Sequence, residues 1–472
     1  MVFASPIFLF LFLPITLLGY YLIHPKFRNF WLFLMSFIFY AWGGLSYALI
    51  LLFSTLMNYL FGILIDKSKE KYKKSILILS IVYNLGILGF FKYFSFILYN
   101  IQEMIRIFIP QFTMEIPKIS LPIGISFFTF QIMSYVIDLY RKEIRLQKSF
   151  LNLGLYIMLF PQLIAGPIVR YIDVEKEIYE RKVDIDKFYI GLKRFVLGLG
   201  KKVLIANAMG SWADYAFTIS LDKLSTPLAW LGIFGYTMQI YFDFSAYSDM
   251  AIGLGKMFGF DFLENFNYPY ISQNIQEFWR RWHMSLSGWF RYYLYIPLGG
   301  NRKGKKRAYI NSFIVFFCTG LWHGAAWNFI FWGLFHGIFL IIEKIGFGDI
   351  LKRIPRIFRH IYTLLVVIIG WVFFRAETFT MALRYLKRLF IFDFNKLEYF
   401  FLGLDNWKIF MGFCAIIFSL PSIQFAKKYL TNNIKENFLY ELSSMLLYIM
   451  LFLISICFIT GSSFNPFIYF RF

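Results

Sequence analysis

Long apolar runs recur from one end of the chain to the other, and they constrain its fold more than any other feature. Of the 472 residues, 59% are hydrophobic and only 16% are charged. A soluble globular chain has about 45–50% apolar and about 25% charged residues, so this chain lacks the polar sequence to cover a soluble surface. Inside a bilayer the backbone groups must bond to one another, which favours helices. The sequence therefore predicts an all-α, polytopic integral membrane protein.

The apolar runs divide into candidate spans. They are residues 5–23, 30–42, 47–65, 75–99, 121–140, 153–168, 190–208, 228–258, 310–342, 361–374, 407–420 and 439–459. Since a full crossing takes about 20 residues, about 10–12 membrane helices are predicted, and the shorter runs are expected to be re-entrant or buried. No linker, low-complexity tract or internal repeat interrupts them, so residues 1–472 are interpreted as one integral membrane domain.

Basic residues gather in short clusters between the apolar runs, and the formal net charge is +21. This pattern is typical of the cytoplasmic loops of membrane proteins, and no nucleic-acid partner is predicted. If the clusters at 66–74 and 427–435 are cytoplasmic, both chain ends are extracytoplasmic. Residues 5–21 lack the basic start and the cleavage site of a secretion signal, so they are expected to remain as the first span. The three cysteines have no paired spacing, and no metal site is predicted.

One histidine lies inside an apolar run, in the segment 319–328 with the sequence TGLWHGAAWN. A polar ring in hydrocarbon is costly unless it is satisfied or used, and imidazole exchanges protons near neutral pH. Gly320 and Gly324 form a small-residue pair that lets helices approach closely, so His323 is expected at a seam between helices. It is either a neutral general base, worth ~10²–10⁴ in rate, or a structural histidine satisfied by a neighbour.

A second histidine follows in the same run. On one continuous helix over 310–342, His336 would be turned about 220° from His323, so it is interpreted as a packing residue. Trp322 and Asn328 flank His323 and are candidates for supporting it.

The segment 278–290, FWRRWHMSLSGWF, carries another histidine. At steps of four, three and four, one helical stripe is predicted for Trp279, His283, Leu286 and Phe290. An interfacial helix whose Arg280 and Arg281 reach water or lipid phosphate explains the two arginines well. It explains less well a histidine on the aromatic stripe, so His283 is a second candidate catalytic residue, with the two arginines as possible support.

Two carboxylates, Asp243 and Asp249, lie in the apolar segment IYFDFSAYSDMAIG. Intramembrane carboxylates are costly and usually paired. Asp243 and Asp249 are expected to orient a catalytic group or to pair with Arg291, and a purely structural pair fits equally well. The basic loop 301–307 is interpreted as a cytoplasmic loop in preference to a phosphate clamp.

The chain ends in SSFNPFIYFRF, which contains Tyr469. Its aromatic rings suit the interface between the membrane and water on the extracytoplasmic side. A phenol with a pKa of ~10 can also act as a nucleophile when a base is near, so Tyr469 is a possible acyl relay.

Several of these segments, in this order, resemble the membrane-bound O-acyltransferase (MBOAT) family. The blocks that carry the resemblance are MVFASPIFLFLFLPI, LPIGISFFTFQIMSYVIDLYR, FPQLIAGPIVRY, IYFDFSAYSDMAIGLG, FWRRWHMSLSGWFRYYLYIPLGGNR, GLWHGAAWNF and WVFFRAET. They cover most of the chain. The bacterial branch is the most similar, with its alginate O-acetylation membrane subunit and, more distantly, the D-alanyl transfer protein of teichoic acid modification.

The resemblance implies a helical bundle around a central funnel, with His323 as the catalytic histidine and His283 as a second signature histidine that supports it. It implies a bacterial cytoplasmic membrane location and passage of an acyl group, most simply acetyl, from a cytoplasmic thioester to an exported polysaccharide. The donor would be acetyl-CoA or an acyl carrier protein, and no tightly bound cofactor is expected. Membrane lipid and an extracytoplasmic esterase-like transferase would be the partners, and a tail tyrosine like Tyr469 would accept the acyl group.

Two other functions remain open at this point. D-alanyl transfer to teichoic acid is the rival in chemistry. A polytopic transporter or flippase is the rival from another class, although such proteins are built from inverted repeats that are not visible here.

Overall fold

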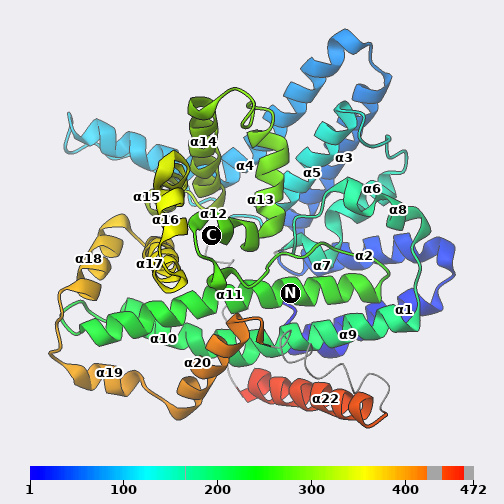
Figure 1. Cartoon of the computed structure of the whole chain (residues 1–472). Helices are drawn as coiled ribbons and strands as arrows, with labels where there is room; N and C mark the ends of the chain where they lie inside the picture. Colours follow the sequence, from blue (N-terminus) through cyan, green and yellow to red (C-terminus); the bar gives the residue numbers. More distant parts are fainter. Residues whose placement is uncertain (165, 423–437, 462–472) are drawn as a thin grey trace.

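A computed structural model describes residues 1–164, 166–422 and 438–461. These residues are mostly helical and contain no β-strand, which confirms the all-α class. The α-helices are α1 Leu13–Leu22, α2 Arg28–Ala41, α3 Leu45–Lys67, α4 Glu70–Arg106, α5 Ile125–Tyr140, α6 Phe150–Met158, α7 Phe160–Leu163, α8 Tyr171–Glu180, α9 Ile185–Gly200, α10 Asn207–Thr218, α11 Thr226–Met257, α12 Ile275–Arg281, α13 Met284–Phe290, α14 Lys305–His323, α15 Trp327–Ile342, α16 Gly348–Arg353, α17 Arg356–Arg375, α18 Phe379–Phe390, α19 Leu397–Gly403, α20 Asn406–Ser419 and α22 Phe438–Gly461 (Figure 1).

Short π-helices and 3₁₀ turns join several of these helices. The π-helices are η1 Phe8–Phe12, η3 Lys201–Ala206, η5 Arg291–Tyr295 and η6 Glu343–Phe347, and the 3₁₀ turns are η2 Pro25–Phe27 and η4 Pro269–Ile271. A π-turn inserts an extra residue into a helix and shifts the direction of the side chains that follow.

Five helices among the described residues are long and apolar enough to cross a membrane, and α19 with α20, bent by 77°, would make a sixth. The chain is therefore a multi-pass membrane protein, with fewer full-length spans than the predicted apolar runs. The run 153–168 is broken into α6 and α7, and η1 precedes α1 in the first run. Irregular backbone is tolerated at membrane depth where protein covers it, and α6 and α7 are largely buried.

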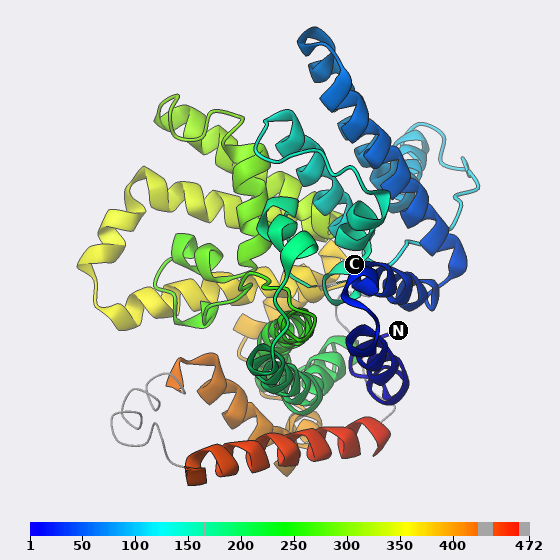
Figure 2. The same cartoon turned by 90° about the vertical axis from the view of Figure 1, so that its right-hand side faces the viewer.

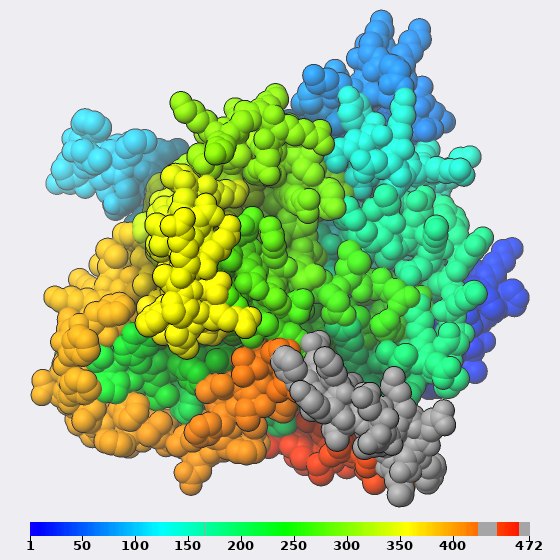
Figure 3. Space-filling view, in the orientation of Figure 1, coloured from blue at the N-terminus to red at the C-terminus, as the bar shows by residue number. Residues whose placement is uncertain are grey.

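The helix α11 forms the buried axis of the molecule, and α9 and α10 run beside it (Figures 1 and 2). Small residues allow this close packing. A methyl group on Gly198 of α9 would lie 2.7 Å from the carbonyl oxygen of Ala246, and one on Gly235 would lie 2.8 Å from that of Met209. By contrast, both ends of α4 project from the body (Figure 3).

The predicted continuous span 310–342 is wrong, because the chain folds there as a helical hairpin. Helix α14 ends at His323 and α15 begins at Trp327. The expected close approach is nevertheless confirmed. A methyl group on Gly320 would lie 2.5 Å from the carbonyl oxygen of Phe329, and one on Gly333 would lie 2.9 Å from the Cα of Gly320. The calculated rotation between His323 and His336 therefore does not apply, since the two residues lie on different helices.

Candidate active site

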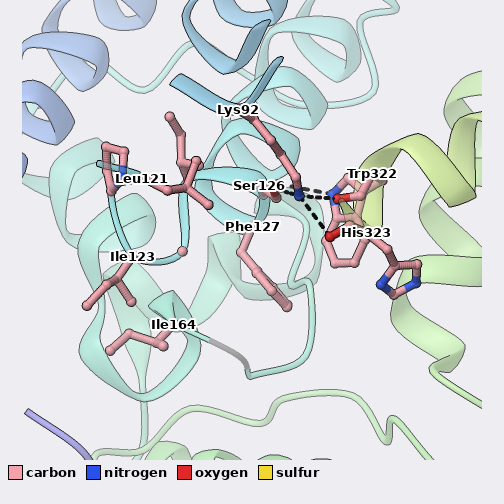
Figure 4. A pocket seen from close by; sticks show the side chains of 11 residues that line it. Lys92, Leu121, Ile123, Ser126, Phe127, Ile164, Trp322 and His323 are labelled. Atoms are coloured by element: carbon pink, nitrogen blue, oxygen red, sulfur yellow. Dashed lines mark hydrogen bonds between the residues drawn. The ribbon is translucent and has the colours of Figure 1, made fainter. Parts of the chain in front are cut away.

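His323 is the last residue of α14, where the helix leaves backbone carbonyls without partners of their own. Two side chains of α4 supply donors to these carbonyls. The Lys92 Nζ donates to the carbonyl oxygens of Trp322 at 2.5 Å and His323 at 3.1 Å, and the Tyr93 hydroxyl donates to that of Leu321 (Figure 4). A cation is also favourable at the negative end of a helix dipole. The backbone of His323 is thus fixed by a helix more than 200 residues earlier in the chain.

The imidazole of His323 lies in an aromatic box. Its ring centre is 4.9 Å from those of Trp322 and Trp332 and 5.0 Å from that of Phe374, each in an edge-to-face arrangement. The side chain is buried, and its Nδ1 has no hydrogen-bond partner among the residues that the structure describes. A buried ring nitrogen without a partner is available to a substrate, and burial favours the neutral form that can accept a proton.

The structure corrects the environment predicted for His283. Helix α12 ends at Arg281, and His283 then adopts the left-handed conformation, with φ of 43°, before α13 starts at Met284. No single helix runs through this segment, so the predicted stripe from Trp279 to Phe290 is wrong. Such a backbone conformation is uncommon for a residue with a Cβ and persists where the surroundings hold it.

A side chain outside the motif holds His283. Its Nδ1 lies 3.0 Å from the side-chain Oδ1 of Asn265, and the backbone carbonyl oxygen of Asn265 accepts from the backbone N–H of Met284 at 2.9 Å. The Nε2 of His283 is buried and has no partner within the described part of the chain. As with His323, one ring nitrogen is left for a ligand.

Histidines and tryptophans alternate in a row through this region. The ring of Trp322 lies between those of His283, at 6.0 Å, and His323, at 4.9 Å. Trp332 in turn separates His323, at 4.9 Å, from His336, at 5.3 Å. His336 is fully buried among aromatic rings, in keeping with a packing role. The two candidate histidines are therefore neighbours across one indole.

A cavity of about 270 Å³ opens beside this row (Figure 4). Lys92, Ser126, Phe127, Trp322 and His323 are among its lining residues. The Nζ of Lys92 also donates to the Ser126 hydroxyl at 3.2 Å. Figure 4 shows the Lys92 amine directed at the end of α14, with the His323 imidazole on the far side of that helix end.

A second cavity, of about 670 Å³, is lined by residues next to His283. Asn265 and Met284 are in its wall, together with a network of ion pairs. In this network Asp249 pairs with Arg194 at 2.9 Å and with Lys201 at 2.7 Å. His283 thus contacts Asn265 in the wall of the second cavity, and its ring centre lies within 6.5 Å of those of Phe127 and Trp322 in the wall of the first.

Comparisons with known proteins identify the family of this chain. Residues 79–384 match the sequence model of the MBOAT, membrane-bound O-acyltransferase family. The chain belongs to the membrane-bound O-acyltransferase family. It is an acyltransferase, and the transporter alternative falls with this finding.

Three relatives show the range of similarity. A probable alginate O-acetylase of Pseudomonas aeruginosa is 45% identical over 83% of this chain and 75% of its own length. A peptidoglycan O-acetyltransferase of Helicobacter pylori is 37% identical over 82% of this chain and 79% of its own length. A teichoic acid D-alanyltransferase of Bacillus subtilis is 31% identical over only 46% of this chain and 58% of its own length.

Asp243 and Asp249, the two carboxylates expected to support the site, both form ion pairs. Asp243 is fully buried and pairs with Lys202 at 2.8 Å. Since Asp249 also pairs with cations of the α9–η3 segment, the predicted pairing with Arg291 is wrong. The π-helix η3 carries consecutive lysines to two different carboxylates of α11. Breaking such a buried pair leaves an uncompensated charge, so the Asp243–Lys202 pair stabilises the packing of η3 against α11.

The other predicted supporting residues hold the framework near the histidines. Arg281 pairs with Glu277 at 3.0 Å, whereas Arg280 is exposed. Asn328 donates to the carbonyl oxygens of Phe373 at 3.2 Å and Ala376 at 2.8 Å, which ties the start of α15 to the end of α17. Tyr469 lies outside the described residues.

Sequence reasoning missed Lys92 and Asn265. Lys92 had a signal, because it is a lysine inside the predicted span 75–99, and an ionisable residue at such a position suggests a function. Asn265 lies in a polar loop between apolar segments, and nothing in its sequence context distinguishes it from Asn267.

Proposed function

We propose that the chain transfers an O-acetyl group from a cytoplasmic thioester donor, acetyl-CoA or an acyl carrier protein, toward an exported cell-surface polysaccharide, in a bacterial cytoplasmic membrane. Membership of the family supports acyl transfer. The names of the relatives favour acetyl, because the two O-acetyl-transferring relatives align over about four fifths of this chain and the D-alanyl-transferring one over under half.

The observation that carries the chemistry concerns His323, a residue that lines the first cavity and whose ring Nδ1 has no hydrogen-bond partner among the described residues. Acting as a general base, His323 takes the proton from the attacking hydroxyl. The hydroxyl oxygen forms a bond to the thioester carbonyl carbon, the C–S bond breaks, and the proton passes from the imidazole to the departing thiolate. His283, one indole away, contacts or orients one of the reacting groups.

Lys92 acts on this step through the end of α14. A lysine ammonium has three N–H donors, and Lys92 has three acceptors: the carbonyls of Trp322 and His323 and the Ser126 hydroxyl. No donor remains for a negatively charged intermediate, so Lys92 is a positioning residue rather than a catalytic residue.

A polymer analysis tests the function. In a strain lacking this chain, the exported polysaccharide should lose acetyl esters, and wild-type chain should restore them while the His323→Ala variant should not. Mass spectrometry of the released esters separates the two chemistries. Loss of D-alanyl esters with acetyl esters intact would overturn the acetyl assignment in favour of the teichoic acid alternative.

The proposed orientation follows from the basic clusters and puts the tail outside the cell. A cysteine introduced as Ser463→Cys, in a variant without the three native cysteines, should react with a membrane-impermeant thiol reagent in intact cells. Reaction only after lysis would reverse the orientation.

On this proposed orientation, Tyr469 accepts the acetyl group as a phenolic ester and passes it to an extracytoplasmic esterase-like transferase. Tyr469→Phe keeps the ring and removes the nucleophile, so acetylation of the polymer should fall as far as it does when the last six residues are deleted. Wild-type acetylation in the Phe variant, at equal protein level, would reduce the tail to a membrane anchor.

A further inference from the structure

Asn265 makes a set of hydrogen bonds that determines which nitrogen of His283 carries the proton. Its Oδ1 lies 3.0 Å from the His283 Nδ1, 3.3 Å from the backbone nitrogen of Ser285 and 2.9 Å from the Ser285 hydroxyl. Its Nδ2 donates to the Ser248 hydroxyl at 3.0 Å. Asn265 is buried, so these contacts replace its contacts with water.

The backbone fixes the orientation of the Asn265 amide. A backbone N–H can only donate, so the atom facing the Ser285 nitrogen must be the carbonyl oxygen and not the NH₂ group. An amide oxygen can only accept. The His283 Nδ1 at 3.0 Å from it must therefore be the N–H nitrogen of the ring.

The Ser285 hydroxyl does not compete for the Nδ1 of His283. It accepts from the backbone N–H of Ile168 at 3.0 Å and has a single hydrogen to donate. That hydrogen has the Asn265 Oδ1 at 2.9 Å, whereas the His283 Nδ1 lies at 3.5 Å. The shorter contact takes it, and no hydroxyl donor is left for the Nδ1.

The ring of His283 is neutral, because it is buried among aromatic side chains and has no anionic partner in its described hydrogen bonds. A neutral imidazole has one N–H, so the lone pair lies on the Nε2, which is buried and unpartnered in the described structure. Trp322 and Phe127, whose rings lie 6.0 and 6.5 Å from that of His283, both line the first cavity.

We propose that Asn265 is a positioning residue that holds His283 in the Nδ1–H form and so makes its Nε2 a hydrogen-bond acceptor for the attacking hydroxyl or, after the C–S bond breaks, for the departing thiol. The role of the acceptor rests on the proposed acyl transfer, whereas the protonation form does not. Asn265 thereby links the wall of the second cavity to His283.

A spectroscopic test reads the proton directly. The chain has five histidines, so ¹⁵N NMR of the ¹⁵N-histidine-labelled full-length protein in lipid gives few side-chain signals, and a His283→Gln variant assigns those of His283. The wild type should show a protonated Nδ1 and an unprotonated Nε2. Asn265→Ala should remove this preference. A wild-type spectrum with the proton on Nε2 would overturn the proposal.

Activity measurements test the consequence with a matched control. Asn265→Ala should lower kcat for acyl transfer ~10–100-fold, the range known for the partners that orient metal-bound histidines, with little change in KM for the donor. Asn265→Asp, which keeps an acceptor at the Nδ1, should recover most of the rate. Asn267→Ala should stay near wild type, since Asn267 lines the same cavity but is exposed.

Each outcome has a defined meaning. Equal losses in Asn265→Ala and Asn267→Ala, or no recovery with Asp in a protein of unchanged melting temperature, would contradict the positioning role. If NMR shows a protonated Nδ1 and an unprotonated Nε2 on His283 but the protein transfers no acyl group, the proposed function is contradicted and the proton assignment stands.

Discussion

The two candidate histidines occupy similar places and are held in opposite ways. His323 ends a helix, and Lys92 of α4 binds its backbone carbonyl, while its Nδ1 has no partner among the described residues. His283 follows a helix end in a left-handed turn, and Asn265 binds its ring. One imidazole is positioned through the main chain and the other through its own nitrogen.

Because the two histidines are positioned differently, different substitutions should disturb each of them. A residue positioned through its backbone should be sensitive to changes in distant side chains that cap the helix. A residue positioned through its ring should be sensitive to the one group that binds it. Substitutions at the two histidines, and at the α4 residues Lys92 and Tyr93 that bind the end of α14, separate the two cases.

The largest effect is expected at His323. His323→Ala should lower acyl transfer by at least about 10³-fold, in the upper part of the range for a general base, with normal insertion and protein level. His336→Ala is the matched control, because it removes a buried imidazole from the same row of rings. Equal loss of activity in both variants would assign the effect to packing instead of proton transfer.

His283→Ala should come next, with a loss of about 10²-fold measured in the same assay. The reason is that its Nε2 contacts the reacting pair but does not replace the base. Near-normal acetylation of the polymer by this variant would show that His283 is a structural residue, and His323 would remain as the candidate catalytic histidine.

Lys92→Met should lower acyl transfer about tenfold, because displacement of a catalytic group by even ~1 Å can cost up to ~10²-fold. It leaves two carbonyls at the end of α14 without a buried donor, so the melting temperature should also fall. Lys344→Met is the control, since Lys344 donates to Ser312 nearer the start of α14. If both variants slow transfer alike, the helix as a whole matters, and its end has no special role.

Tyr93→Phe should have the smallest effect. It removes one hydroxyl donor to the Leu321 carbonyl and leaves Lys92 in place. Loss of one hydrogen bond costs about 1 kcal/mol, which should appear in chemical denaturation with nearly unchanged transfer. A loss of activity as large as that of Lys92→Met would show that the carbonyl at Leu321 also sets the position of His323.

The sequence predicted the class of fold, both histidine segments and the close approach of Gly320, because composition and short motifs carry that information. It did not predict that α14 would end at His323 or that His283 would lie in a left-handed turn. Periodicity describes a helix but not its end, and these ends depend on donors that lie far away in the chain, such as Lys92. Asn265 could not be found for the same reason, since its role comes from a contact across 18 residues.

The alternation of imidazole and indole along the row has a consequence for turnover. An indole can donate its N–H but has no lone pair to take up a proton, so Trp322 and Trp332 cannot carry protons from one histidine to the next. With His323 as the proposed base, a proton captured there has no route along this described row to His283 or His336. In the proposed step it departs with the thiol product, so that the leaving molecule itself resets the enzyme for the next cycle.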